Sequence, residues 1–115
     1  MTFRLFLTAA AATIATAAAA QGPRIQQVAT FDQEVTGVAA AQDGRMFVNF
    51  PRWNADVPIS VAEVRANGSI VAYPNAEWNS WRNASAAQVD PRTHFVNVQS
   101  VVADRRGSLW VLDPG

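Results

Sequence analysis

Two stretches of the chain carry the same pattern, VTGVAAAQDGRMFV at residues 35–48 and VQSVVADRRGSLWV at residues 98–111. When Gly44 is aligned with Gly107, apolar residues fall at equivalent places in both copies, at an offset of 63 residues. Each copy places β-branched or aromatic residues on both sides of a polar turn, which predicts two antiparallel strands. We expect both glycines to adopt a positive φ, since glycine is the residue that tolerates it.

A second pair of strands is predicted between the two copies. The segments ISVAEVR at residues 59–65 and IVAY at residues 70–73 flank an Asn67-Gly68 turn, and Asn-Gly is the strongest short hairpin signal. One period therefore holds four antiparallel strands, and a four-stranded unit repeated at fixed spacing is typical of a β-propeller blade. The alternative is a small free-standing β-domain in which two ordinary hairpins resemble each other by chance.

The sequence therefore predicts an all-β fold that comprises the first one and a half blades of a β-propeller. Blade one covers about residues 35–73, a linker covers residues 74–96, and blade two begins over residues 97–115. Propellers close four to eight blades around a central channel. We therefore expect the remainder of the propeller to lie C-terminal to Gly115.

The first 20 residues are predicted to be a secretory signal peptide. Arg4 precedes an alanine-rich apolar run that ends in small residues just before Gln21, which is the order of features in such a leader. The run is short and interrupted by threonine for a membrane span; the alternative is an alanine-rich amphipathic helix. We expect a secreted protein, extracellular or periplasmic, with residues 21–115 as its incomplete propeller domain and no membrane association after cleavage.

Composition limits the kinds of partner and site. Nine basic residues, all of them arginine, balance nine acidic ones, which argues against nucleic acid or an anionic membrane as the main partner. Half of the residues are hydrophobic, which favours an ordered fold. The absence of cysteine excludes a disulfide scaffold and any thiolate metal site.

Four residues are candidates for binding a small-molecule ligand. Asn97 and Gln99 alternate with valine at the start of a predicted inner strand, where polar side chains would face the channel. Arg52 and Trp53, in the loop at residues 50–58, can bind an anionic or aromatic ligand. The structural alternatives are that the polar residues bind channel water or cap strand ends, and that Trp53 packs between blades while Arg52 pairs with an aspartate.

An ordered set of short segments resembles the major royal jelly protein/Yellow family, in a bacterial form. The segments are DGRMFV at 43–48, PRW at 51–53, VP at 57–58, YPN at 73–75, WN at 78–79, VQSV at 98–101 and LWVLDPG at 109–115. The resemblance implies a secreted six-bladed propeller, and six periods would need about 380 residues. Pro114 departs from the Thr, Ser or Val that relatives often carry. The lack of cysteine differs from the often disulfide-bonded animal relatives and puts animal-specific roles in doubt.

Three functions follow from these observations and from the resemblance. The first is a propeller that binds or isomerises a small aromatic metabolite in its channel, as dopachrome-converting members of the family do. The second is a metal-dependent gluconolactonase-like hydrolase, in which Glu34 and a divalent ion would polarise a lactone carbonyl and activate water; its other ligands are expected beyond Gly115. The third is a non-catalytic secreted interaction protein. No catalytic residue carries over from the family, and a divalent metal is expected only for the second function.

Overall fold

The computed structural model describes residues 22–54 and 57–115; the predicted signal peptide lies outside them. These residues form six short strands and two 3-10 helices: β1 (Gly37–Ala40), β2 (Met46–Asn49), β3 (Val61–Val64), β4 (Ile70–Ala72), η1 (Asn83–Gln88), η2 (Pro91–Thr93), β5 (Ser100–Ala103) and β6 (Leu109–Leu112). The fold is all-β, as predicted. In the part of the chain that the structure describes, no helix has the length and hydropathy needed to cross a membrane.

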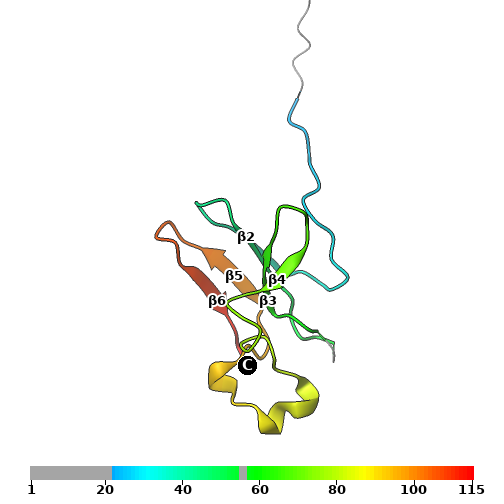
Figure 1. Ribbon diagram of the computed structural model, residues 1–115, viewed down its shortest axis with the longest axis vertical. Coiled ribbons are helices and arrows are strands. Elements are labelled where there is room, and N and C mark those ends of the chain that lie inside the picture. The colour runs from blue at the N-terminus through cyan, green and yellow to red at the C-terminus, as the bar shows by residue number, and fades with distance from the viewer. Residues whose placement is uncertain (1–21, 55–56) are drawn as a thin grey trace, which may run out of the picture.

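The strands form two antiparallel sheets (Figure 1). The first contains four strands in the order β1-β2-β3-β4, with Val38 opposite Val48 and Ala62 opposite Ala72. The second contains β5 and β6, with Val101 opposite Val111. Short polar turns join β1 to β2, β3 to β4 and β5 to β6, whereas the longer loop at residues 50–60 joins β2 to β3. The prediction of four antiparallel strands within one period is therefore confirmed.

The two copies of the repeat fold alike. The bounds of β5 and β6 are those of β1 and β2 moved by 63 residues, which is also the separation of Thr36 and Gln99. Gly44 and Gly107 both have a φ of 86°, in the left-handed region that glycine enters at little cost. The Gly44 N–H donates to Ala41 O over 3.0 Å, and the Gly107 N–H donates to the equivalent Asp104 O over 3.4 Å.

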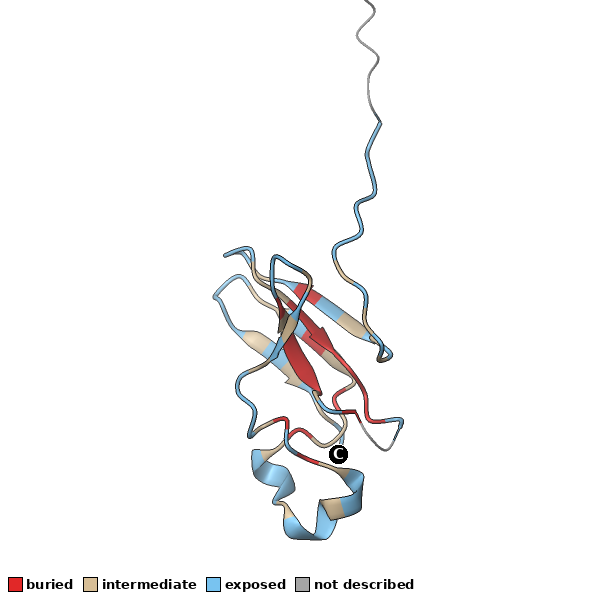
Figure 2. Ribbon diagram, turned by 45° about the vertical axis from the view of Figure 1, so that its right-hand side comes forward, coloured by how far each residue is buried: buried red, intermediate tan, exposed pale blue. Residues whose placement is uncertain are grey.

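Apolar clusters cover both faces of the four-stranded sheet at its middle strands, β2 and β3, which are the most buried (Figure 2). One face packs against the β5–β6 hairpin, and the residues of this contact include Ala39, Phe47, Val61, Val98 and Val101. Apolar residues in the segment before β1, which we call the N-terminal strap (residues 27–35), pack on the other face. That second cluster includes Phe31, Val35, Val48, Phe50, Ala62 and Val64. The strap is held partly by an edge-to-face contact of Phe31 with Phe50, at 5.5 Å between ring centroids.

The β5–β6 hairpin is covered on one face only. Val101 and Val111 face the four-stranded sheet, whereas Val102, Trp110 and Leu112 are exposed to solvent. The exposed Val102 and Trp110 are the equivalents of Ala39 and Phe47, which are buried in the first copy. The face of the first sheet that carries Ala39 and Phe47 is therefore covered by the second sheet, and the equivalent face of the second sheet, with Val102 and Trp110, is exposed.

Candidate functional site

The polar candidates gather where β1 and β5 begin and β2 ends, a region that we call the rim (Thr36, Asn49, Arg52, Asn97 and Gln99). The Thr36 hydroxyl donates to Gln99 O over 3.1 Å and so joins equivalent positions of the two repeats. Asn49 Nδ2 donates to Thr36 Oγ1 over 2.8 Å and to Val98 O over 3.0 Å. These bonds fix the first sheet against the second at this end.

Arg52 is a buried cation in the rim. It is only 5% exposed, and its backbone N–H donates to Asn97 Oδ1 over 2.9 Å. Its guanidinium donates to Val57 O and, over 3.1 Å, to Asn79 O, while Nε has no hydrogen-bond partner among the described residues. Arg52 forms no ion pair with an aspartate within the described ranges, in contrast to the structural alternative above.

The surroundings of Arg52 lower its pKa to about 10. Desolvation by burial is the largest cause, the positive charge of Arg82 adds to it, and the negative charge of Asp113 opposes both. A pKa near 10 still leaves the guanidinium protonated at neutral pH. The rim therefore contains a buried positive charge, that of Arg52. Its guanidinium donates hydrogen bonds to backbone carbonyls and to no carboxylate of the described residues.

Asn97 and Gln99 are joined to each other and held by Asp113. Gln99 Nε2 donates to Asn97 Oδ1 over 3.0 Å, and the Asp113 carboxylate accepts from the backbone N–H groups of Val96 and Asn97 over 2.7 and 2.9 Å. Asn97 Nδ2 and Gln99 Oε1 have no hydrogen-bond partner in the described part of the chain. One amide donor and one amide acceptor therefore remain available to a ligand.

Trp53 and Glu34 are the candidates that are exposed. Trp53 is 58% exposed, so it does not fill space between the two described sheets. Glu34 is exposed and forms no ion pair with any described residue. Within residues 22–54 and 57–115, no three His, Asp or Glu residues are grouped so that they could hold a metal ion. The metal site therefore stays a prediction.

Two buried asparagines in this region were not predicted from the sequence. Asn79 Oδ1 accepts from the backbone N–H groups of Ser60 and Val61, and its Nδ2 donates to Tyr73 O and Asn75 O. Asn49 Oδ1, by contrast, has no partner in the described residues although the side chain is fully buried. The sequence offered one signal for Asn79, which lies in one of the segments that carry the family resemblance. It offered no signal for Asn49, which follows an apolar run.

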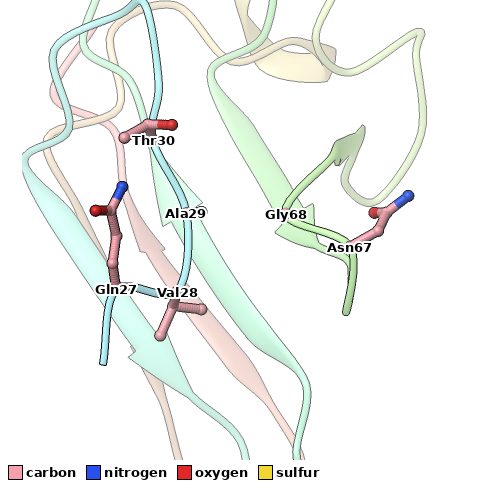
Figure 3. A pocket seen from close by; sticks show the side chains of 6 residues that line it. All are labelled: Gln27, Val28, Ala29, Thr30, Asn67 and Gly68. Atoms are coloured by element: carbon pink, nitrogen blue, oxygen red, sulfur yellow. The ribbon is translucent and has the colours of Figure 1, made fainter. Parts of the chain in front are cut away.

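A separate pocket of about 290 Å³ lies between the N-terminal strap and the β3–β4 turn (Figure 3). It is lined by Gln27, Val28, Ala29, Thr30, Asn67 and Gly68. The Asn67 side chain points away from the strap, and its Oδ1 accepts from the Ser69 N–H and hydroxyl. No lining residue has an ionisable side chain, so this pocket provides no acid, base or metal ligand.

Comparisons with known proteins show a distant similarity to the Yellow proteins. The chain is 29% identical over 72 residues to Protein yellow of Drosophila melanogaster and of Drosophila simulans. The match covers 62% of this chain but only 13% of each fly protein. No family model matches the chain, and no solved structure matches it.

Proposed function

We propose that the two sheets are neighbouring blades of an exported β-propeller, and that the rim binds a small aromatic metabolite of the kind handled by dopachrome-converting proteins. The face of the first sheet that carries Ala39 and Phe47 is covered by an equivalent unit, which supports a propeller, because in a ring each unit is covered by the next. The ligand class is the one that the resemblance to the major royal jelly protein/Yellow family implies, and the similarity to Protein yellow supports only a distant relationship to that family.

The observation that carries the proposal is the presence of two free amide atoms, Asn97 Nδ2 and Gln99 Oε1, in a hydrogen-bonded group with the buried Arg52, which the exposed Trp53 follows in the sequence. Asn97 Nδ2 donates to the ligand and Gln99 Oε1 accepts from it. Trp53 stacks on the aromatic ring. Arg52 raises the local positive potential, which favours an electron-rich or anionic ligand. Its two Nη groups donate to the backbone carbonyls of Val57 and Asn79.

Binding, and not isomerisation, is the activity that these residues support. A proton transfer at the ligand needs a side chain with a free acidic or basic group. The Asp113 carboxylate already accepts three backbone N–H groups, those of Val96, Asn97 and Gly115. Among the described residues of the rim, none carries an unengaged carboxylate or imidazole. Isomerisation would need a group from elsewhere in the protein.

Titration calorimetry with dihydroxyphenylacetate, an anionic catechol, tests the proposal on the purified chain and its variants. We expect Trp53→Ala to weaken binding about fivefold, since stacking on an aromatic side chain is worth roughly 1 kcal/mol, and Gln99→Ala to weaken it about threefold through the loss of one hydrogen bond. Trp110→Ala is the matched control, because Trp110 is also exposed but lies in β6. Unchanged affinity in Trp53→Ala would contradict the proposal.

A second assay addresses the competing chemistry. If the protein hydrolyses a sugar lactone only in the presence of a divalent ion, and Glu34→Gln abolishes this activity, the site is a metal-dependent hydrolase and the proposal of aromatic binding at the rim is wrong. We expect no such dependence on Glu34, which is exposed and, among the described residues, belongs to no group of three that could hold a metal ion.

A further inference from the structure

The turn between β3 and β4 contains the only Asn-Gly pair in the sequence, Asn67-Gly68. Both strands that it joins lie within the described residues, and Val64 is paired with Ile70 beside the turn. The Asn67 side chain is exposed and points away from the N-terminal strap (Figure 3). The backbone nitrogen of a glycine can approach the side chain of a preceding asparagine closely, because glycine has no Cβ to obstruct the approach.

Three described turns have the same form, and only this one has a carboxamide before its glycine. Gly44, Gly68 and Gly107 have φ values of 86°, 82° and 86°, and each glycine N–H donates to the carbonyl three residues earlier. Asp43 precedes the first of these glycines, Asn67 the second and an arginine the third. The first turn therefore shows that an aspartate at this position is compatible with the same backbone.

The hydrogen bonds of the Asn67 carboxamide favour attack on its carbon. Oδ1 accepts from the Ser69 N–H over 3.0 Å and from the Ser69 hydroxyl over 2.7 Å. Negative charge develops on this oxygen when a nucleophile adds to the amide carbon, and two donors already directed at it stabilise that charge. The amide nitrogen, Nδ2, has no hydrogen-bond partner in the described part of the chain. No bond within the turn therefore holds the leaving group.

The attacking nitrogen is restrained by the turn. The Gly68 N–H donates to Arg65 O over 2.8 Å, and this bond must open before the nitrogen reaches the carboxamide carbon. Arg65 is exposed and Gly68 is half-buried, and hydrogen bonds in such exposed turns open locally at a small cost in free energy. We therefore expect the reaction to occur in the folded protein, more slowly than in the unfolded chain.

We propose that Asn67 is a site of spontaneous modification, at which the folded protein loses ammonia and then takes up water. A bond forms between Gly68 N and Asn67 Cγ, the bond from Cγ to Nδ2 breaks, and ammonia leaves with the proton of the Gly68 N–H. The product is a cyclic imide, and water adds to one of its carbonyl carbons to give aspartate or isoaspartate at position 67. The reaction adds a tenth acidic group to a chain of nine basic and nine acidic residues. It does not depend on ligand binding at the rim.

The two products differ in their effect on the hairpin. Aspartate keeps the backbone of the turn, as in the equivalent turn of the first hairpin. Isoaspartate adds one methylene to the main chain, so the bonds from Gly68 N to Arg65 O and from Arg65 N to Ser69 O cannot both persist. We expect hydrogen exchange of the Arg65 amide to become at least about tenfold faster in this product. The Ala41 amide, which has the same place in the first turn, is the internal control.

Ageing of the purified full-length chain at mildly alkaline pH, followed by tryptic digestion and mass spectrometry, tests the proposal. Cleavage at the arginines separates residues 66–82, which contain Asn67, from residues 83–92, which contain Asn83. Asn83 is the matched comparison, because it is exposed and has a serine two residues later, but is followed by alanine and not by glycine. We expect replacement of NH2 by OH, located by fragment spectra, to be at least about tenfold faster at Asn67 than at Asn83.

Two variants separate this reaction from general ageing of the chain. Asn67→Gln should abolish the change in residues 66–82 at this position, because the longer side chain places its amide carbon one bond farther from the Gly68 nitrogen. Ser69→Ala removes the hydroxyl donor to Oδ1 and should slow the reaction about threefold, the effect of one hydrogen bond.

Three outcomes would overturn the proposal. One is an equal rate at Asn67 and Asn83 in the folded protein. Another is modification of Asn67 in urea but not in the folded protein, because it would show that the bond from Gly68 to Arg65 prevents the attack. The third is a faster reaction in Ser69→Ala, because it would show that the serine bonds hold the carboxamide away from the nitrogen.

Discussion

The β1–β2 and β5–β6 hairpins share one sequence pattern and one backbone, yet their surroundings differ. Phe47 in the first is 2% exposed and Trp110, its equivalent in the second, is 66% exposed. Phe47 packs edge-to-face on Tyr73 with ring centroids 4.8 Å apart and lies against the β5–β6 hairpin. Trp110 instead donates its indole N–H to Asp104 over 2.9 Å. The comparison shows that the repeat sets the conformation of a hairpin, whereas its neighbours decide what each side chain contributes.

The starts of β1 and β5 differ in a second way. A Cβ at Gly37 would lie 2.3 Å from Asn49 Oδ1 and 3.1 Å from Val101 N, so only glycine fits between the two sheets there. The equivalent position in β5 is Ser100, which carries a side chain because Leu112 opposite it is exposed. Close packing in the first repeat therefore selects a residue that the second repeat does not need.

The largest expected difference between the hairpins is in the cost of removing the equivalent aromatic side chains. Phe47→Ala should lower the free energy of unfolding by about 3–5 kcal/mol, because it leaves a cavity in the packed contact between the sheets. Trp110→Ala should change it by only about 0.5 kcal/mol, as expected for an exposed side chain. Urea unfolding of both variants at one protein concentration measures the difference. Equal losses would mean that Trp110 is covered in solution.

An equal effect is expected where the two hairpins are alike. Gly44→Ala and Gly107→Ala should each lower the free energy of unfolding by about 1 kcal/mol, since both residues have a φ of 86° and an L-residue is strained there. No atom lies within 4 Å of a Cβ built at either position, so the cost is conformational in both. The same urea experiment applies, and costs that differ by more than about twofold would show that the two turns are not equivalent.

The smallest expected effect concerns the aspartates of the two turns. The Arg45 backbone N–H and then the Arg45 side chain lower the pKa of Asp43, whereas the Trp110 indole N–H is the first cause that lowers the pKa of Asp104. Trp110→Phe should therefore raise the pKa of Asp104 and leave that of Asp43 unchanged. Carboxyl carbon shifts followed by NMR between pH 2 and 6 measure both. A shift of Asp43, or none of Asp104, would contradict the assignment.

The sign of the pH effect follows from these lowered pKa values. Both carboxylates are better stabilised in the folded chain than in the unfolded one, so their contribution to stability is present above the ordinary aspartate pKa of about 3.9. It is lost as the pH falls through the lowered folded values. Both side chains are on exposed turns, so the change is small and screened by salt.

Local pattern was enough to determine the strands and their turns. Alternating apolar residues around Gly44, Gly68 and Gly107 specify antiparallel hairpins, because each turn closes over few residues and the glycine accepts the φ that the turn requires. The 63-residue offset also predicted the equivalence of the two hairpins, since equal local sequences adopt equal local structure. Asn97 and Gln99 were candidates because of their place at a strand start and Arg52 because of its loop, and the bond from the Arg52 N–H to Asn97 Oδ1 that joins them is seen only in the structure.

Only the tertiary structure decided which groups are free. Asn79 became a buried centre of hydrogen bonds, Trp53 remained exposed, and the guanidinium of Arg52 turned to backbone carbonyls, because burial and bonding depend on segments far apart in the sequence. Sequence thus determined the conformation of each hairpin, and packing determined the availability of its atoms.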